Sequence, residues 1–392
     1  MGVLVCVAEI DCPRIIPIPP NNLTLMSRFN SSSPLWFEKG FIIIFKVWFM
    51  NNNYKKLQII NYFLLFSIII ADIVYLKIIN VNIFTNGYGI RESGFYVIYL
   101  SSFLVAVSAT LYLTKYLSII GIIGCSPERK LEKKINDFIC NKHRTFQKIM
   151  LMLFEGVLLL SLISFSALIF TYLAASSLNP FYDTYLLNID KLIGFNWLAY
   201  ARYVNENPNI HNFLYFSYGL REQLIIAVFI FALSNNKKQI HSFILVFSLS
   251  LTAVTIVSCL YPALGEVYSN KVKPTDFPLI NLQDGFIHIE HVYNMRNGGD
   301  IDLDIATGII TFPSFHTCLA IMFIWFFRIV PYFRWFSLIT NTAMLFATPI
   351  FGGHYIADMI AGALITIPLI VLVEKIANND VIPFRQVYKN SC

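Results

Sequence analysis

Two stretches near the C-terminus decide how this chain is interpreted: residues 312–317, Phe-Pro-Ser-Phe-His-Thr, and residues 352–358, Gly-Gly-His-Tyr-Ile-Ala-Asp. Each opens a strongly apolar segment. His354 and Asp358 are four residues apart, so on a helix they lie on one face, where the carboxylate can hold the imidazole in one tautomer and orientation. This spacing is typical of a nucleophilic or basic histidine.

The first stretch has the features of a helix start that binds an anion. Pro313 suits the first turn of a helix, and Ser314 can offer a hydroxyl and a free N–H there. His316 follows within the same turn. A single histidine near a membrane helix end is usually an interfacial or packed residue. Two histidines and an aspartate at matched helix starts favour a functional site instead.

The composition identifies a membrane protein. Of the 392 residues, 56% are hydrophobic and only 13% are charged, and a soluble domain cannot bury that much apolar surface. The 29 Lys and Arg exceed the 23 Asp and Glu, but the surplus lies in a few loops, so we expect no nucleic-acid partner. The seven cysteines are scattered without ligand spacing, which indicates reduced or packed thiols.

The apolar segments predict an all-α polytopic membrane protein with about eight spans. Residues 1–56 are expected to form a cytoplasmic segment with an interfacial amphipathic helix at 37–50, and 57–123 a hairpin of two membrane helices. A basic cytoplasmic loop (124–148), a catalytic domain of six membrane helices (149–376) and a cytoplasmic tail (377–392) complete the chain. The expected spans are 57–79, 95–123, 149–175, 212–234, 240–261, 313–330, 336–351 and 354–373.

Lys and Arg gather in alternate connections, which indicates the cytoplasmic side. These connections contain residues 55–56, 129–148, 237–238, 328–334 and 375–385. We therefore expect both termini to be cytoplasmic. The same assignment puts His316 and His354 together at helix starts on the opposite side, so that a site built from them faces the periplasm, the exterior or a lumen.

Two long connections share that outer side. We expect residues 176–211 to contain a short surface helix, and residues 262–311 to contain loop residues that include His288 and His291, both facing solvent. Long polar loops beside a site usually shape or cover it.

The two stretches resemble signatures of the type-2 phosphatidic acid phosphatase superfamily. Residues 313–316 (Pro-Ser-Phe-His) are similar to its second signature, and the His354 to Asp358 spacing is similar to the end of its third. Together with residues 190–197 (Asp-Lys-Leu-Ile-Gly-Phe-Asn-Trp), they resemble the branch that contains the inositol phosphorylceramide synthases. The resemblance covers about residues 149–376 and implies a six-helix core, here preceded by two extra membrane helices.

The chain also departs from the family pattern. Thr348 stands where the third signature has an arginine, and the first signature is not recognisable. The cationic partners of a phosphate are therefore open. Arg296 is the first candidate, because a guanidinium can hold two phosphate oxygens at once; Lys271 and Lys273 are weaker ones, and for all three solvated loop charge is the alternative.

The resemblance implies a phosphohistidine mechanism without metal or cofactor. His354, held by Asp358, would be the nucleophile, and His316 would protonate the leaving alcohol and later deprotonate the acceptor. Ser314 and backbone N–H groups at the two helix starts, including that of Gly353, would bind the phosphate. Two histidines and an aspartate could instead bind zinc, but no zinc-binding motif accompanies them.

The expected function is a lipid phosphotransferase or phosphatase in the bilayer, acting on a phospholipid or sphingolipid-type substrate. The branch implies transfer of an inositol phosphoryl-like headgroup to a lipid or alcohol. Hydrolysis of phosphatidic acid-type or prenyl pyrophosphate-type substrates is the alternative within the family. A non-catalytic lipid transporter or scaffold is the alternative of another class; a transporter should show inverted repeats, and the sequence has no convincing internal repeat.

Ionisable residues inside predicted spans also need partners, because charge in lipid is costly. Asp72 lies in the first span and Glu155 in the third, while Arg221 and Glu222 lie in the fourth. We expect Glu155 and Arg221 to form a structural pair. The basic run 127–148 is expected to be an amphipathic helix lying against anionic lipid.

Overall fold

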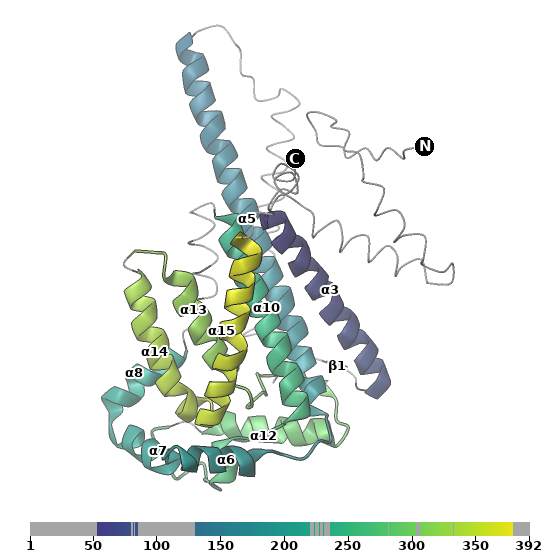
Figure 1. Ribbon diagram of the computed structural model, residues 1–392, viewed down its shortest axis with the longest axis vertical. Helices are drawn as coiled ribbons and strands as arrows, with labels where there is room; N and C mark the ends of the chain where they lie inside the picture. Colours follow the sequence, from purple (N-terminus) through teal and green to yellow (C-terminus); the bar gives the residue numbers. More distant parts are fainter. Residues whose placement is uncertain are drawn as a thin grey trace, which may run out of the picture. The chain divides into compact units, whose positions relative to one another are not determined.

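A computed structural model of the protein describes residues 53–79, 81, 83–84, 130–219, 223, 227, 230, 236–280, 282–302, 306–331 and 333–378. Within these ranges the chain is almost entirely helical, as Figure 1 shows, which confirms the predicted all-α class. The predicted interfacial helix at 37–50, the predicted span 95–123, Arg221 and most of the C-terminal tail lie outside the described residues.

Four of the described helices are long and apolar enough to cross a membrane. Their apolar cores coincide with four predicted spans, and the chain is therefore an integral membrane protein. These helices are α3 (Asn53–Ile79), α5 (Lys130–Ala175), α10 (Lys237–Leu260) and α15 (Ile356–Asn378).

The expected spans 313–330, 336–351 and 212–234 do not match any of these four long helices. Helix α13 (Phe315–Phe327) has 13 residues, about 20 Å at 1.5 Å per residue, which is less than the roughly 30 Å hydrocarbon layer. Helix α14 (Phe333–Phe351) has 19 residues and buries Thr340, Asn341 and Thr348. Residues 212–218 belong to α8 (Pro208–Tyr218), and most of 219–234 lies outside the described residues.

The boundary expected at residue 148 between a basic loop and a span lies inside one helix, whose candidate span is Glu155–Ala175. Helix α5 runs through it without interruption for 46 residues. From residue 130 on, the helix expected in the basic run is thus the first part of α5, and the sequence has no proline between 130 and 175 that would end it.

Helix α10 lies in the centre of the apolar core and packs against α3, α5, α13 and α15. Its Phe243 contacts two aromatic residues of α13, with ring centroids 4.5 Å from Phe326 and 5.9 Å from Phe323. The Ser314 N–H at the start of α13 donates to the Asp358 carbonyl near the start of α15, so the two helices begin at the same end of the group, where Figure 1 shows α6 and α12.

Polar side chains join α5 to its neighbours inside the apolar layer. Gln58 and Tyr62 of α3 donate to the Glu155 carboxylate, and His241 of α10 lies 3.7 Å from it. These are the partners that the described residues give Glu155, and the expected pairing with Arg221 stays a prediction because Arg221 lies outside the described residues. Ser166 donates in the same way to Asp72.

Short helices form a layer at the end of the group where α13 and α15 begin (Figure 1). The connection expected to hold one surface helix contains α6, α7 and the start of α8. In α7, the indole of Trp197 donates to the Pro349 carbonyl at 2.6 Å and so ties this layer to α14. The layer consists of α6 (Asp183–Leu192), α7 (Trp197–Glu206), α8, α11 (Glu266–Ser269) and α12 (Gln283–Arg296).

One pairing joins the N-terminal part of the described chain to this layer. Strand β1 (Ile83–Phe84), which follows α3, pairs in parallel with β2 (Ile301–Asp302), which follows α12. The hydrophobic pattern does not predict a ladder of two residues, because so short a strand has no period.

Helix α15 lies close to the start of α13 at Gly362. A Cβ atom at this position would lie 2.5 Å from the carbonyl oxygen of Ser314, which is backbone and cannot move aside. Any side chain here must therefore push the two helices apart.

We expect Gly362→Ala to lower the free energy of unfolding by about 1–3 kcal/mol, as overpacking does. Thermal unfolding of the purified protein in detergent measures this. Gly308→Ala is the matched control, because nothing lies within 4 Å of a Cβ at Gly308. Equal melting temperatures for the two variants would contradict the close helix approach.

Candidate active site

Ser314 forms the N-cap of α13. Its hydroxyl oxygen accepts from the Thr317 N–H at 3.3 Å, and its own N–H donates to the Asp358 carbonyl at 3.0 Å. Ser314 is fully buried. The expectation that its N–H is free for an anion is therefore wrong: this N–H joins the start of α13 to the start of α15.

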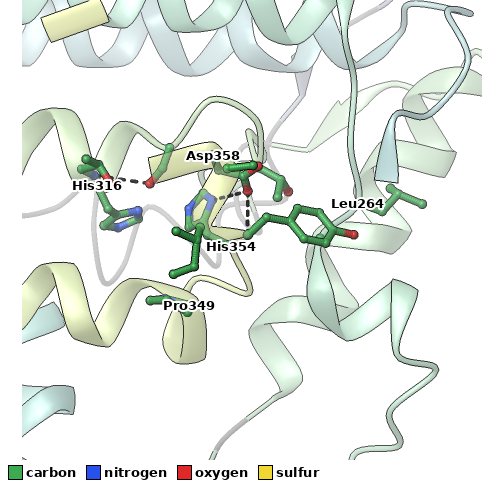
Figure 2. A network of polar contacts seen from close by, with 12 residues as sticks. Leu264, His316, Pro349, His354 and Asp358 are labelled. Atoms are coloured by element: carbon green, nitrogen blue, oxygen red, sulfur yellow. Dashed lines mark hydrogen bonds and ion pairs between the residues drawn. The ribbon is translucent and has the colours of Figure 1, made fainter. Parts of the chain in front are cut away.

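His354 and Asp358 meet at a helix start rather than on a helix face. Helix α15 begins at Ile356, so His354 lies in the turn before it. The His354 Nδ1 is 3.2 Å from Asp358 Oδ2, and the same oxygen accepts from the Tyr355 N–H at 3.0 Å (Figure 2). Both side chains are buried. The carboxylate thus fixes the turn and orients the imidazole. The spacing correctly predicts this contact, but the contact forms in the turn before α15 and not on one face of a helix.

Carboxylates from α6 anchor this turn. Asp190 accepts from the N–H groups of Ile356 and Ala357 at 2.8 and 3.0 Å, which occupies N–H groups that were expected to bind phosphate. Asp183 accepts from the Tyr355 hydroxyl at 2.9 Å and from the N–H of Gly265 at 2.8 Å. The role of Asp190 had a signal in the sequence, because Asp190 is the first residue of the segment 190–197 that resembles the family.

Gly353 and Glu266 form the other side of the turn. Gly353 has φ +62°, and its carbonyl accepts from the Glu266 N–H at 2.8 Å. Gly353 therefore shapes the backbone that carries His354. Its expected role as a phosphate ligand stays a prediction.

The two histidines of the separate stretches lie side by side. The ring centroids of His316 and His354 are 6.0 Å apart, with the ring planes inclined at 63° (Figure 2). Burial lowers the pKa of His354 to about 4, and a hydrogen bond with the backbone of Thr311 opposes this. His354 is therefore uncharged at neutral pH, so one of its two ring nitrogens carries a lone pair.

His288 and His291 do not lie in a solvent-facing loop, so that expectation is wrong. Both are on α12, where His291 Nδ1 is 2.7 Å from the Tyr172 hydroxyl and is buried. His288 Nε2 is 2.9 Å from the Thr311 hydroxyl. Burial, followed by the nearby His354, lowers the pKa of His288 to about 4. The spacing of three residues between these histidines could have predicted that they share one face of a helix.

Arg296, the first candidate for a cationic phosphate ligand, has other partners. Its Nη2 donates to the Asn179 carbonyl at 2.8 Å, and its guanidinium carbon lies 3.6 Å from the centroid of the Phe181 ring. Lys271 and Lys273 are exposed on the segment after α11. Among the described residues, no group of three or more His, Cys, Asp or Glu side chains is arranged to hold a metal ion.

The buried Glu266 carboxyl makes the anchoring layer sensitive to pH. Burial, followed by the nearby Asp190 carboxylate, raises the pKa of Glu266 to about 8 from an ordinary value of 4.5. The folded state therefore binds a proton more tightly than the unfolded state. This contribution to stability is fully present below about pH 4.5 and is lost as the pH rises through about 8.

We expect Glu266→Gln to remove this loss, because the amide resembles the protonated carboxyl and does not ionise. The melting temperature of the wild type should fall between pH 5 and 9 by more than that of the variant, in the same detergent. Glu206→Gln, at an exposed position of α7, should keep the wild-type slope. Identical slopes for all three proteins would show that Glu266 does not titrate in this range.

Of the comparisons with known proteins, the one with protein-family models gave a match. No curated protein and no solved structure matched the chain. A family model does match, and its match supports an enzyme of the phosphatase type in general. Residues 184–372, just under half of the chain, are similar to the PAP2 superfamily, and Ser314, His316, His354 and Asp358 all lie inside the matched region.

Proposed function

We propose that the protein is a membrane enzyme that transfers a phosphate-containing headgroup, or phosphate itself, to or from a lipid through a phosphohistidine on His354. The observation that carries this proposal is the pair of imidazoles 6.0 Å apart, one of them held by a buried carboxylate. The match of residues 184–372 to the PAP2 superfamily supports the same class of reaction.

In the first half-reaction, His354 attacks phosphorus. Its Nδ1 is engaged by Asp358, so Nε2 is the attacking atom. The P–N bond forms, the P–O bond to the leaving alcohol breaks, and His316 gives that oxygen its proton. The rings are close enough for one phosphate group, lying beside the pair rather than between the rings, to meet a nitrogen of each imidazole at the roughly 3–3.5 Å that reacting atoms require.

In the second half-reaction, the hydroxyl of the acceptor gives its proton to His316 and attacks phosphorus. The P–N bond breaks, and His354 returns to its starting state. An alcohol or lipid acceptor gives transfer, and water gives hydrolysis. We favour an inositol phosphoryl-like headgroup and a sphingolipid-type acceptor because of the resemblance of residues 190–197 and of both histidine stretches.

The charge on the phosphate needs donors close to the two rings. We assign this role to the Ser314 hydroxyl, whose oxygen already caps α13, and to the field at the start of that helix. We do not assign Arg296 this role, because its guanidinium donates to the Asn179 carbonyl and stacks on the Phe181 ring. The distribution of Lys and Arg supports a site at the outer leaflet, with both termini in the cytoplasm.

We expect His354→Ala to abolish turnover, with a loss of about a thousandfold or more, because no other group forms the P–N bond. Purified protein in detergent micelles, given a phospholipid with a ³²P-labelled headgroup and EDTA, measures turnover and the trapped phosphoenzyme. His291→Gln, on the face of α12 that contacts Tyr172, should keep activity. Full activity of His354→Ala, or activity that EDTA removes, would overturn the mechanism.

We expect His316→Ala to lower the rate by roughly a hundredfold or more with a natural alcohol leaving group, the scale of a lost general acid. A substrate with a p-nitrophenyl leaving group needs no proton at that oxygen, so the loss in phosphoenzyme formation should shrink. Single-turnover measurement of p-nitrophenol release tests this. Losses that are the same for both substrates would remove His316 from the role of acid.

A further inference from the structure

Tyr218, the last residue of α8, stacks on His316. The ring centroids are 4.4 Å apart, with an angle of 22° between the planes. The Tyr218 hydroxyl is 3.4 Å from His316 Nδ1. This is longer than the usual 2.7–3.2 Å, but hydrogen bonds in an enzyme without substrate often tighten when the substrate binds.

The same hydroxyl also lies close to His354. A Cβ atom placed on Gly352 would be 2.9 Å from the Tyr218 hydroxyl oxygen and 2.5 Å from His354 Cδ2. The Tyr218 hydroxyl oxygen and His354 Cδ2 therefore both lie next to the position that a Cβ of residue 352 would occupy. The phenol reaches the region between the two stretches, and glycine at position 352 leaves it the room to do so.

A contact at Nδ1 determines which nitrogen of His316 exchanges protons. In the proposed mechanism the uncharged ring must accept a proton from the acceptor hydroxyl, so one nitrogen must carry hydrogen while the other is free. A hydroxyl oxygen that accepts from Nδ1–H stabilises the tautomer with the free lone pair on Nε2. The stacked phenol ring holds the imidazole in the matching orientation.

We propose that Tyr218 is the positioning residue of His316: it accepts from Nδ1–H, so that Nε2 gives the proton to the leaving oxygen and takes one back from the acceptor. This inference rests on the proposed function, in which His316 is the general acid and base. Asp358 performs the corresponding task for His354, because its Oδ2 lies 3.2 Å from the His354 Nδ1.

The chain offers a matched control one turn earlier on the same helix. Tyr215 is exposed, and its ring lies 5.4 Å from that of Phe351. Tyr218 contacts the same ring, with centroids 5.9 Å apart. The two tyrosines thus share a helix and an aromatic neighbour, but the contact with His316 distinguishes Tyr218.

Tyr218→Phe keeps the stacked ring and removes only the hydroxyl. We expect kcat to fall roughly tenfold or more, as part of the hundredfold or more that general acid–base catalysis supplies, while KM changes less than twofold. The loss should shrink with the p-nitrophenyl substrate, as it does for His316→Ala. Tyr215→Phe should match the wild type in every measurement.

The double variant Tyr218→Phe/His316→Ala tests whether the two residues act together. If Tyr218 acts through His316, the double variant is no slower than His316→Ala alone. Multiplied losses would overturn the inference and indicate a separate structural role, which the melting temperature of Tyr218→Phe would also report.

The outcomes separate the two proposals. Wild-type kinetics of Tyr218→Phe beside an impaired His316→Ala would reject the positioning role and leave the proposed function intact. Wild-type kinetics of both variants would reject the proposed function itself.

Discussion

The hydrogen bond from the Ser314 N–H to the Asp358 carbonyl is the constraint on which the site depends. It joins the starts of α13 and α15, two helices that come from separate stretches of the chain. Gly362 permits the approach because it places no atom against the Ser314 carbonyl. With the two helix starts fixed in this way, the imidazoles of His316 and His354 lie next to each other without further adjustment.

The layer around the turn is acidic, whereas the expected substrate is an anion. The carboxylate oxygens of Asp183 and Asp190 accept hydrogen bonds from backbone N–H groups and from the Tyr355 hydroxyl, and burial raises the pKa of both carboxyl groups. Glu266 keeps its proton up to about pH 8. Asp183 and Asp190 therefore act as fixed hydrogen-bond partners of the backbone, and the proton that Glu266 holds removes one negative charge that would repel an approaching phosphate.

The sequence predicted the helical class, four of the spans and the meeting of His354 with Asp358, because apolar length and i, i+4 spacing are local signals. It did not predict the details that depend on tertiary packing. The Ser314 N–H is not free, because it donates to a residue 44 positions away, and His288 is half-buried beside the Thr311 hydroxyl because it lies on α12 instead of in a loop. The contact of Tyr218 with His316 joins residues 98 positions apart, and no local pattern carries such information.

The central place of α10 has a consequence for the boundaries of the folding unit. The region similar to the PAP2 superfamily starts at residue 184 and leaves out α3 and α5, yet both helices cover apolar faces of α10. Strand β1, also outside that region, pairs with the segment that leads towards Thr311. A fragment cut at the limits of family similarity would therefore expose part of its own core, because α3 and α5 belong to the same packed core as the region similar to the PAP2 superfamily.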